Sequence, residues 1–378
     1  MLSSLKVVSF VLLMVLLVVG FNLARHKPLW TDEIYSQTVS VEGFSYSDIL
    51  LGKVKEGNPC PLFYLIQKMI CDVTHYRVPS TGLELWDQHA QILLRGGPIF
   101  FMSLAVAAIL YYFVRFYSFS TGLYSLFIAL STPMVWWYWA EARPYALWIF
   151  LTTVQLLLFL SIIRKDELNA RVWNWLAIIH GLLSLTVITS AGPIMAVSVF
   201  LWIFKNRDWE KYLVLTALPL WICFYYYGCS SLSPLWVPNN FMKLISPSIS
   251  VEQMGLFVIY TIFLLVQYFQ SRGSRHVLMV GKEERRFWVL TVLMLAVACS
   301  YIIFYKLREL PGHAGHELPI RQFIFLTPVG ILATVLFSLD IMRAVKNQAW
   351  LRINMAMAIG GLMIIHFLRN CFGIIGIY

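Results

Sequence analysis

Long apolar segments recur along this chain of 378 residues, and they constrain its fold more than any other feature. A helix needs about 20 predominantly apolar residues to cross the hydrocarbon core of a bilayer. The composition agrees, because 59% of the residues are hydrophobic and only 13% are charged, whereas roughly a quarter are charged in soluble proteins. The sequence therefore predicts an all-α polytopic membrane protein, with residues 1–378 forming a single transmembrane domain.

We expect about eleven spans. The first ends near Leu23 and stays uncleaved, because the residues that follow make a poor signal-peptidase site. The others are predicted at approximately residues 94–114, 121–139, 145–163, 172–190, 193–204, 212–228, 251–270, 288–305, 322–340 and 353–371. A first outer loop (24–92) then precedes the rest of a core module (93–228) and the C-terminal spans (229–378).

Charge bias sets the predicted orientation. Residues 59–71 are apolar but too short to span. If they do not cross, the loops on the N-terminal side carry fifteen Lys and Arg residues, against five in the opposite loops after residue 92. Cytoplasmic loops are enriched in Lys and Arg, so we expect a cytoplasmic N-terminus in the inner or plasma membrane. The net charge of +10 then reflects loops facing anionic lipid, not nucleic acid.

Two adjacent acids stand just after the first span, in Trp30-Thr31-Asp32-Glu33. Aromatic residues favour the membrane–water interface, and a partly desolvated carboxylate there is suited to act as a base. The alternative is an ordinary polar flank, or the first turn of an interfacial helix capped by Thr31. Further along this loop, residues 43–55 have the spacing of a helix lying on the membrane surface.

Other polar residues are expected on the same outer side of the membrane. One group is Glu141, Arg143 and Tyr145, in the turn between two predicted spans. A later loop contains His313, His316, Glu317 and Arg321. Acids, histidines and arginines above an apolar bundle favour a site for a charged substrate carried by a lipid, although scattered loop residues would produce part of this pattern.

Trp30-Thr31-Asp32-Glu33 resembles the acidic motif of the GT-C membrane glycosyltransferases, in particular their protein mannosyltransferase-like branch. Further stretches are similar to motifs of that branch in the same order: Asn58-Pro59-Cys60-Pro61-Leu62-Phe63-Tyr64, Leu94-Arg95-Gly96-Gly97-Pro98, Glu141-Ala142-Arg143-Pro144-Tyr145-Ala146-Leu147 and Arg321-Gln322-Phe323-Ile324-Phe325-Leu326-Thr327-Pro328. Asn58 and Cys60 depart from the usual His and Pro, and no large outer C-terminal domain is predicted.

The resemblance implies a GT-C-like bundle with juxtamembrane helices in the first outer loop. It also implies that a polyprenyl-phosphate sugar is the donor and that an acceptor hydroxyl on a glycan, lipid or protein is glycosylated with inversion outside the cytoplasm. Asp32 would be the general base, with Glu33 as an orienting or charge-balancing partner. A lipid-linked glycan flippase or other transporter, and an O-antigen polymerase or ligase, are the alternatives.

The remaining candidates bind substrate in this interpretation. Arg321 would contact donor phosphate through a bidentate guanidinium, or else extend to the interface as a helix-end arginine. Arg143 and Tyr145 would bind donor, unless Arg143 pairs with Glu141. Arg95 lies on the substrate side or bonds helix-end carbonyls.

No cofactor is firmly predicted. His313, His316 and Glu317 leave a divalent metal as an alternative, but Gly and Pro residues make their segment a loop. We therefore expect His313 and His316 to belong to an acceptor-side loop.

Overall fold

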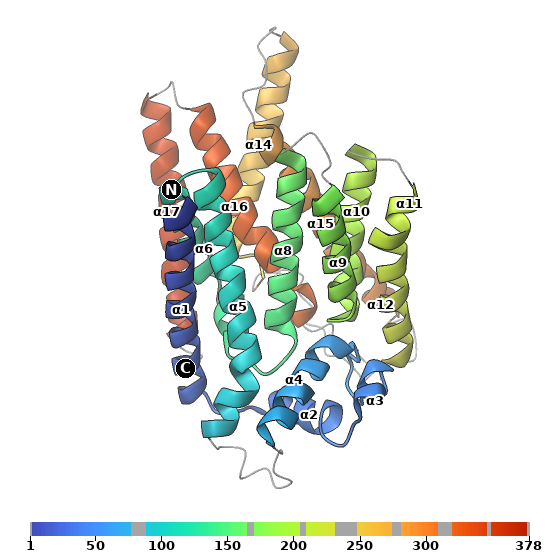
Figure 1. Cartoon of the computed structure of the whole chain (residues 1–378). Helices are drawn as coiled ribbons and strands as arrows, with labels where there is room; N and C mark the ends of the chain where they lie inside the picture. The colour runs from blue at the N-terminus through green and yellow to red at the C-terminus, as the bar shows by residue number, and fades with distance from the viewer. Residues whose placement is uncertain are drawn as a thin grey trace.

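The protein is a bundle of helices, in a computed structural model that describes residues 2–76, 88–164, 170–204, 209–230, 248–273, 281–308, 320–345 and 349–375 (Figure 1). No strand occurs within these ranges. The bundle contains α1 (Leu2–His26), α5 (Gln88–Phe116), α6 (Phe119–Leu130), α8 (Tyr145–Arg164), α9 (Ala170–Ser184), α10 (Ala191–Phe204), α12 (Leu218–Cys229), α14 (Val251–Gly273), α15 (Lys282–Arg308), α16 (Leu326–Ala344) and α17 (Ala349–Ile375).

Shorter elements connect the bundle helices or lie at their ends. They are α2 (Thr31–Ser40), α3 (Tyr46–Leu50), α4 (Pro61–Thr74), α7 (Pro133–Trp139), α11 (Trp209–Tyr212), the 3₁₀ turns Ile188–Ser190 and Ile320–Phe323, and the π-helical turn Leu213–Ala217. Helices α2, α3 and α4 gather at one end of the bundle, beside the lower part of α5 and below the ends of α8, α9 and α12 (Figure 1).

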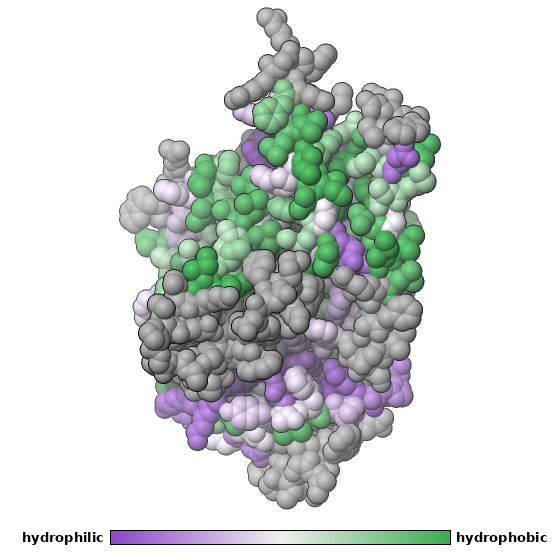
Figure 2. Space-filling view, turned by 180° about the vertical axis from the view of Figure 1, so that it is seen from behind, coloured by the Kyte–Doolittle hydropathy of each residue, from purple (hydrophilic) through white to green (hydrophobic). Residues whose placement is uncertain are grey.

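Seven helices in the described part of the chain are long and apolar enough to cross a membrane. They contain Leu5–His26, His89–Phe116, Tyr145–Arg164, Glu210–Cys229, Val251–Phe269, Lys282–Ile303 and Leu326–Ala344, and shorter apolar helices cover Phe119–Leu130, Ile188–Phe204 and Ile353–Leu368. Figure 2 shows a largely apolar surface over the long helices, with hydrophilic residues gathered at the end that carries α2–α4. The protein is therefore a polytopic helical membrane protein, and the count of eleven membrane spans stays a prediction.

The sequence predicted one span over residues 121–139, and this prediction is wrong, because two separate helices cover the region. Helix α6 ends at Leu130 and α7 begins at Pro133. Proline has no N–H to donate to the preceding turn, and it forces the residue before it out of the helical region. Thr132 accordingly adopts an extended conformation with φ −86° and ψ 119°, so the predicted span is two helical pieces.

The prediction of a surface helix over residues 43–55 is also too long for what the structure shows. Only α3 is helical there, and it begins where the side chain of Ser45 accepts a hydrogen bond from the N–H of Asp48 at 3.1 Å. Gly52 follows with φ +69°, a left-handed conformation that glycine adopts readily. A Cβ at Gly52 would lie 3.1 Å from Tyr226, so this turn packs closely on α12.

The helix ends that carry basic residues lie at the opposite end of the bundle from α2–α4. Arg115 and Arg164 lie in the last turns of α5 and α8, and Arg343 lies in the last turn of α16. The turn between α7 and α8 lies at the other end, because α8 begins there. The polar face made by this turn and by α2–α4 is where the candidate site is found.

Candidate functional site

Helix α2 presents the two adjacent acids, Asp32 and Glu33, in its first turn. Trp30 precedes the helix in an extended conformation, and its N–H donates to Oε2 of Glu33 at 3.2 Å. A Glu at this position commonly binds the N-cap N–H in this way. The expected cap by Thr31 is therefore wrong, since Thr31 is already the first helical residue.

Glu33 forms a two-point ion pair with Arg95 of α5. Nε of Arg95 donates to Oε1 at 2.9 Å and Nη2 donates to Oε2 at 2.6 Å. Oε1 also accepts from the N–H of Ala142 at 2.6 Å. Both side chains are fully buried. Each oxygen of Glu33 thus already accepts two hydrogen bonds in this structure.

Arg95 also binds the end of α1 and the residues that follow it. Nη1 donates to the carbonyls of Ala24 (3.2 Å) and Lys27, and Nη2 donates to that of Pro28 at 2.8 Å. Together with the two bonds to Glu33, these contacts use all five guanidinium N–H groups. The arginine therefore bonds helix-end carbonyls, the second of the two roles expected for it, and it joins α1, α2 and α5.

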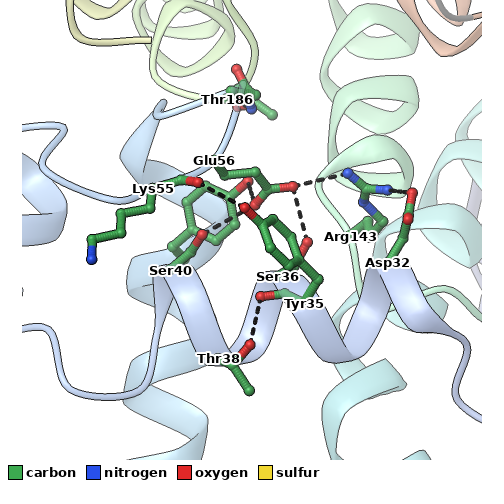
Figure 3. Close-up of polar contacts among 11 residues, drawn as sticks. Asp32, Tyr35, Ser36, Thr38, Ser40, Lys55, Glu56, Arg143 and Thr186 are labelled. Atoms are coloured by element: carbon green, nitrogen blue, oxygen red, sulfur yellow. Dashed lines mark hydrogen bonds and ion pairs between the residues drawn. The ribbon is translucent and has the colours of Figure 1, made fainter. Parts of the chain in front are cut away.

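Arg143 connects two other carboxylates (Figure 3). Its Nη1 donates to Oδ2 of Asp32, and its Nη2 donates to Oε1 of Glu56 at 2.9 Å. Arg143 and Glu56 are buried, with side chains 7% and 6% exposed, whereas the side chain of Asp32 is 37% exposed. Within this three-residue network, Asp32 is the member that solvent or a substrate can reach.

Glu56 was missed by the sequence prediction. Besides Arg143, it accepts hydrogen bonds from Ser36 (3.0 Å), Ser40 (3.1 Å) and Tyr64 (2.6 Å). Asp32, Ser36 and Ser40 are spaced by four residues and share one face of α2 (Figure 3). That polar stripe is visible in the sequence and could have indicated a buried charged partner for α2.

Tyr64 stays protonated beside Glu56. Burial raises the pKa of Tyr64 well above its usual value, and the negative charge of Glu56 raises it further. A protonated phenol donates a hydrogen bond, so Tyr64 helps to hold Glu56 as a charged acceptor next to Arg143.

Tyr145 and Glu141 are also placed around Arg143. The Tyr145 ring lies 5.2 Å from the Arg143 guanidinium carbon, within cation–π range. Glu141 is 4% exposed, and its carbonyl accepts from the N–H of Arg143 at 2.8 Å. Burial lowers the pKa of Lys27, and the negative charge of Glu141 opposes this shift. Arg143 forms ion pairs with Asp32 and with Glu56.

Asn58 fixes the loop that carries Glu56. Its side chain donates to the carbonyl of Thr186 at 3.0 Å and accepts from the N–H of Ile188 at 3.2 Å. The N–H of Leu62 donates to the carbonyl of Leu185 at 2.8 Å. The start of α4 is thereby attached to the turn after α9. Asn58, which stands where the GT-C branch that the sequence resembles has His, thus positions this loop.

The structure describes the candidate residues near the C-terminal end of the chain only in part. The backbone of Arg321 lies in the 3₁₀ turn that precedes α16, but its side chain is outside the described residues, as are His313 and His316. Phe325, at the start of α16, packs on Trp148 in the first turn of α8, with ring centroids 6.0 Å apart. Residue 321 therefore lies toward the same end of the bundle as Arg143.

Among the described residues, no group of three or more His, Cys, Asp and Glu side chains is arranged to hold a metal ion. Comparison of the chain with protein-family models, with curated proteins and with solved structures finds no match. The function is therefore argued from the chemistry of the residues themselves.

Proposed function

We propose that this protein is a membrane glycosyltransferase that moves a sugar from a polyprenyl-phosphate donor to an acceptor hydroxyl. The observation that carries the proposal is the pairing of a partly exposed carboxylate, Asp32, with a buried arginine, Arg143, at one end of an apolar bundle. A lipid-linked phosphate reaches its enzyme from the bilayer, and its polar head must meet a cation at the membrane boundary. The resemblance to the GT-C enzymes supports the same assignment.

Asp32 is the general base of the proposed reaction. It takes the proton from the acceptor hydroxyl while the acceptor oxygen attacks the anomeric carbon. The bond between that carbon and the phosphate oxygen breaks, and the electron pair leaves with the polyprenyl phosphate. Inversion follows from a single displacement, as in the family that the sequence resembles.

Arg143 stabilises the departing phosphate in this scheme. Its Nη2 donates a hydrogen bond to Glu56, while its Nη1 donates to Asp32. A donor phosphate near Nη1 would compete with Asp32 for this bond, and a carboxylate released from an arginine becomes a better base. Donor binding would thus activate Asp32, whereas the buried Glu56 contact keeps the guanidinium in place.

Glu33 and Arg95 position the site in this proposal and do not contact substrate. Both are fully buried with their hydrogen-bonding groups already engaged. Their pair fixes α2 against α1 and α5, and Ala142 of the turn before α8 binds the same carboxylate. The buried Glu33–Arg95 pair therefore helps to fix both α2, which carries Asp32, and the turn that carries Arg143.

The site is proposed to face the extracytoplasmic side of the inner or plasma membrane. The helix ends at the opposite side of the bundle carry Arg115, Arg164 and Arg343. An excess of Lys and Arg is typical of cytoplasmic ends.

The direct test uses the purified full-length protein in lipid nanodiscs with a panel of labelled polyprenyl-phosphate hexoses and pentoses. Membrane and envelope extracts supply the acceptor. The expected result is release of polyprenyl phosphate with transfer of the label, abolished by Asp32→Asn. Transport of a lipid-linked glycan between leaflets, equally fast in the parent and in Asp32→Asn, would instead favour a flippase.

A further inference from the structure

A groove of about 660 Å³ lies on the bundle far from the proposed active site. It is formed mainly by α1, α5 and α8, with α5 between the other two, and Val172 of α9 also lines it (Figure 1). Its walls are almost entirely apolar and include Phe10 of α1, Leu104 and Ala108 of α5, and Leu158 of α8. The chemistry of a groove of this composition on a membrane-spanning bundle suits a hydrocarbon chain.

The length of the groove matches one leaflet. On α5 its lining extends from Leu104 to Phe116, which is about 18 Å at the helical rise of 1.5 Å per residue. One leaflet of a typical bilayer contributes about 15 Å of hydrocarbon. A single acyl chain lying along α5 would therefore fill the groove from the bilayer midplane to the membrane boundary.

Two arginines stand at the boundary end of the groove and line it. The guanidinium carbons of Arg115 and Arg164 lie 5.4 Å and 4.7 Å from the ring of Phe116. Arg115 donates to the hydroxyl of Tyr111 at 2.8 Å, and Arg164 donates to the carbonyl of Phe116 at 3.0 Å. These contacts hold both cations at the groove end.

The charge at this end is net positive. Glu283 lies 3.6 Å from Arg164 and offsets part of its charge. Within the described part of the chain, Arg115 is exposed and forms no ion pair with a carboxylate. Lys6 of α1 is exposed and lies one helical turn from Phe10 on the same face. The groove therefore combines an apolar channel with a cationic end.

We propose that this groove is a binding site for an acidic phospholipid of the leaflet on the Arg115 side, with one acyl chain along α5 and the phosphate at Arg115 and Arg164. Basic helix ends predict that this leaflet is cytoplasmic, where anionic lipids attract Lys and Arg. The inference does not depend on the proposed function, because the groove shares no residue with the proposed active site.

The occupant is not the sugar donor. Arg164 and Tyr145 are at opposite ends of α8, which separates them by about 28 Å at 1.5 Å per residue. A phosphate at Arg164 is therefore far from Arg143, which the proposed reaction requires. A lipid in this groove is therefore separate from the proposed active site.

Native mass spectrometry of the full-length protein in detergent, titrated with dioleoyl phosphatidylglycerol or dioleoyl phosphatidylcholine, tests the proposal. We expect one phosphatidylglycerol to bind in preference to phosphatidylcholine. Arg115→Gln should weaken its binding about fivefold, as expected for one basic residue near an anionic headgroup. Ala108→Trp should block the apolar channel and lower the affinity for both lipids. Lys211→Gln removes an exposed basic residue at the same end, outside the groove lining, and should have no effect.

Equal binding of the two phospholipids would overturn the proposal, and so would an equal loss of phosphatidylglycerol binding in Arg115→Gln and Lys211→Gln. Preferential retention of a polyprenyl phosphate at this groove would also overturn it. If Ala108→Trp fails to fold, the comparison of Arg115→Gln with Lys211→Gln still decides the result.

Discussion

Asp32 and Glu33 are neighbours in the chain, and their carboxylates pair with two different arginines. Glu33 binds Arg95 with both side chains fully buried, whereas Asp32 binds Arg143 and remains 37% exposed. Successive residues of a helix point about 100° apart, so one turn of α2 serves two sites. The proposed function therefore gives the two acids different roles, with Glu33 in positioning and Asp32 in chemistry.

The proposed base is tested by Asp32→Asn, which keeps the shape of the side chain and removes its basicity. Turnover should fall on the order of 10²- to 10⁴-fold, the usual contribution of a general base, while donor affinity changes little. The measurement is single-turnover transfer from a polyprenyl-phosphate sugar. Glu42→Gln, at an exposed acid just after α2, is the control and should retain parental turnover. Near-parental turnover in a folded Asp32→Asn protein would remove Asp32 from the chemistry.

Glu33→Gln should act mainly on stability. Breaking a buried ion pair leaves an uncompensated charge on Arg95 and costs about 3–5 kcal/mol. We expect a clear loss of thermal stability, measured by the unfolding of purified protein in detergent, and a similar loss for Arg95→Gln. The double variant should lose less than the sum of the two single losses, because the residues interact directly. Unchanged stability together with a turnover loss as large as that of Asp32→Asn would place Glu33 in catalysis.

Glu56→Gln should raise the KM for the donor more than it lowers kcat. It removes the charge that holds Nη2 of Arg143, and a hydrogen bond between charged groups contributes about 1.5–3 kcal/mol, so an increase of at least about tenfold is expected. Tyr64→Phe removes one neutral donor to the same carboxylate and should have a smaller effect. An unchanged KM in a folded Glu56→Gln protein would show that Glu56 does not position Arg143 for the donor.

Arg143→Lys should recover only part of the donor affinity that Arg143→Ala loses. An ammonium is a compact point charge and cannot bond Asp32 and Glu56 through two separate nitrogens as the guanidinium does. Donor affinity of both variants can be measured by competition with a labelled polyprenyl-phosphate sugar. Parental affinity in both would show that Arg143 only connects α2 to the loop of Glu56.

The predicted orientation is tested by cysteine accessibility in a variant whose native cysteines are replaced by serine. Lys53→Cys, in the loop after α3, should react with an impermeant maleimide added outside intact cells. Lys211→Cys, at the opposite end of the bundle, should react only after the membrane is opened. Both positions are exposed. The reverse pattern would invert the proposed topology.

The sequence by itself determined the helical membrane class, and it made Asp32 and Glu33 candidates for the site. Hydropathy is a local property, so each apolar run predicts its own helix whatever its neighbours are. Two acids beside a membrane boundary are likewise visible without a fold. Local proline and glycine effects account for the boundary errors, as at Pro133 and Gly52, where the backbone interrupted the predicted pattern.

Only the tertiary structure decided which charges pair. Arg95 is 62 residues from Glu33, and Arg143 is 87 residues from Glu56. The partner of a buried charge depends on where α5 and the turn before α8 meet α2, which is set by the packing of the whole bundle. Desolvation makes each buried charge require an opposite one, but the sequence does not say which. This is why Glu56 was missed, and why the buried Glu33–Arg95 pair could be separated from the more exposed Asp32 only in three dimensions.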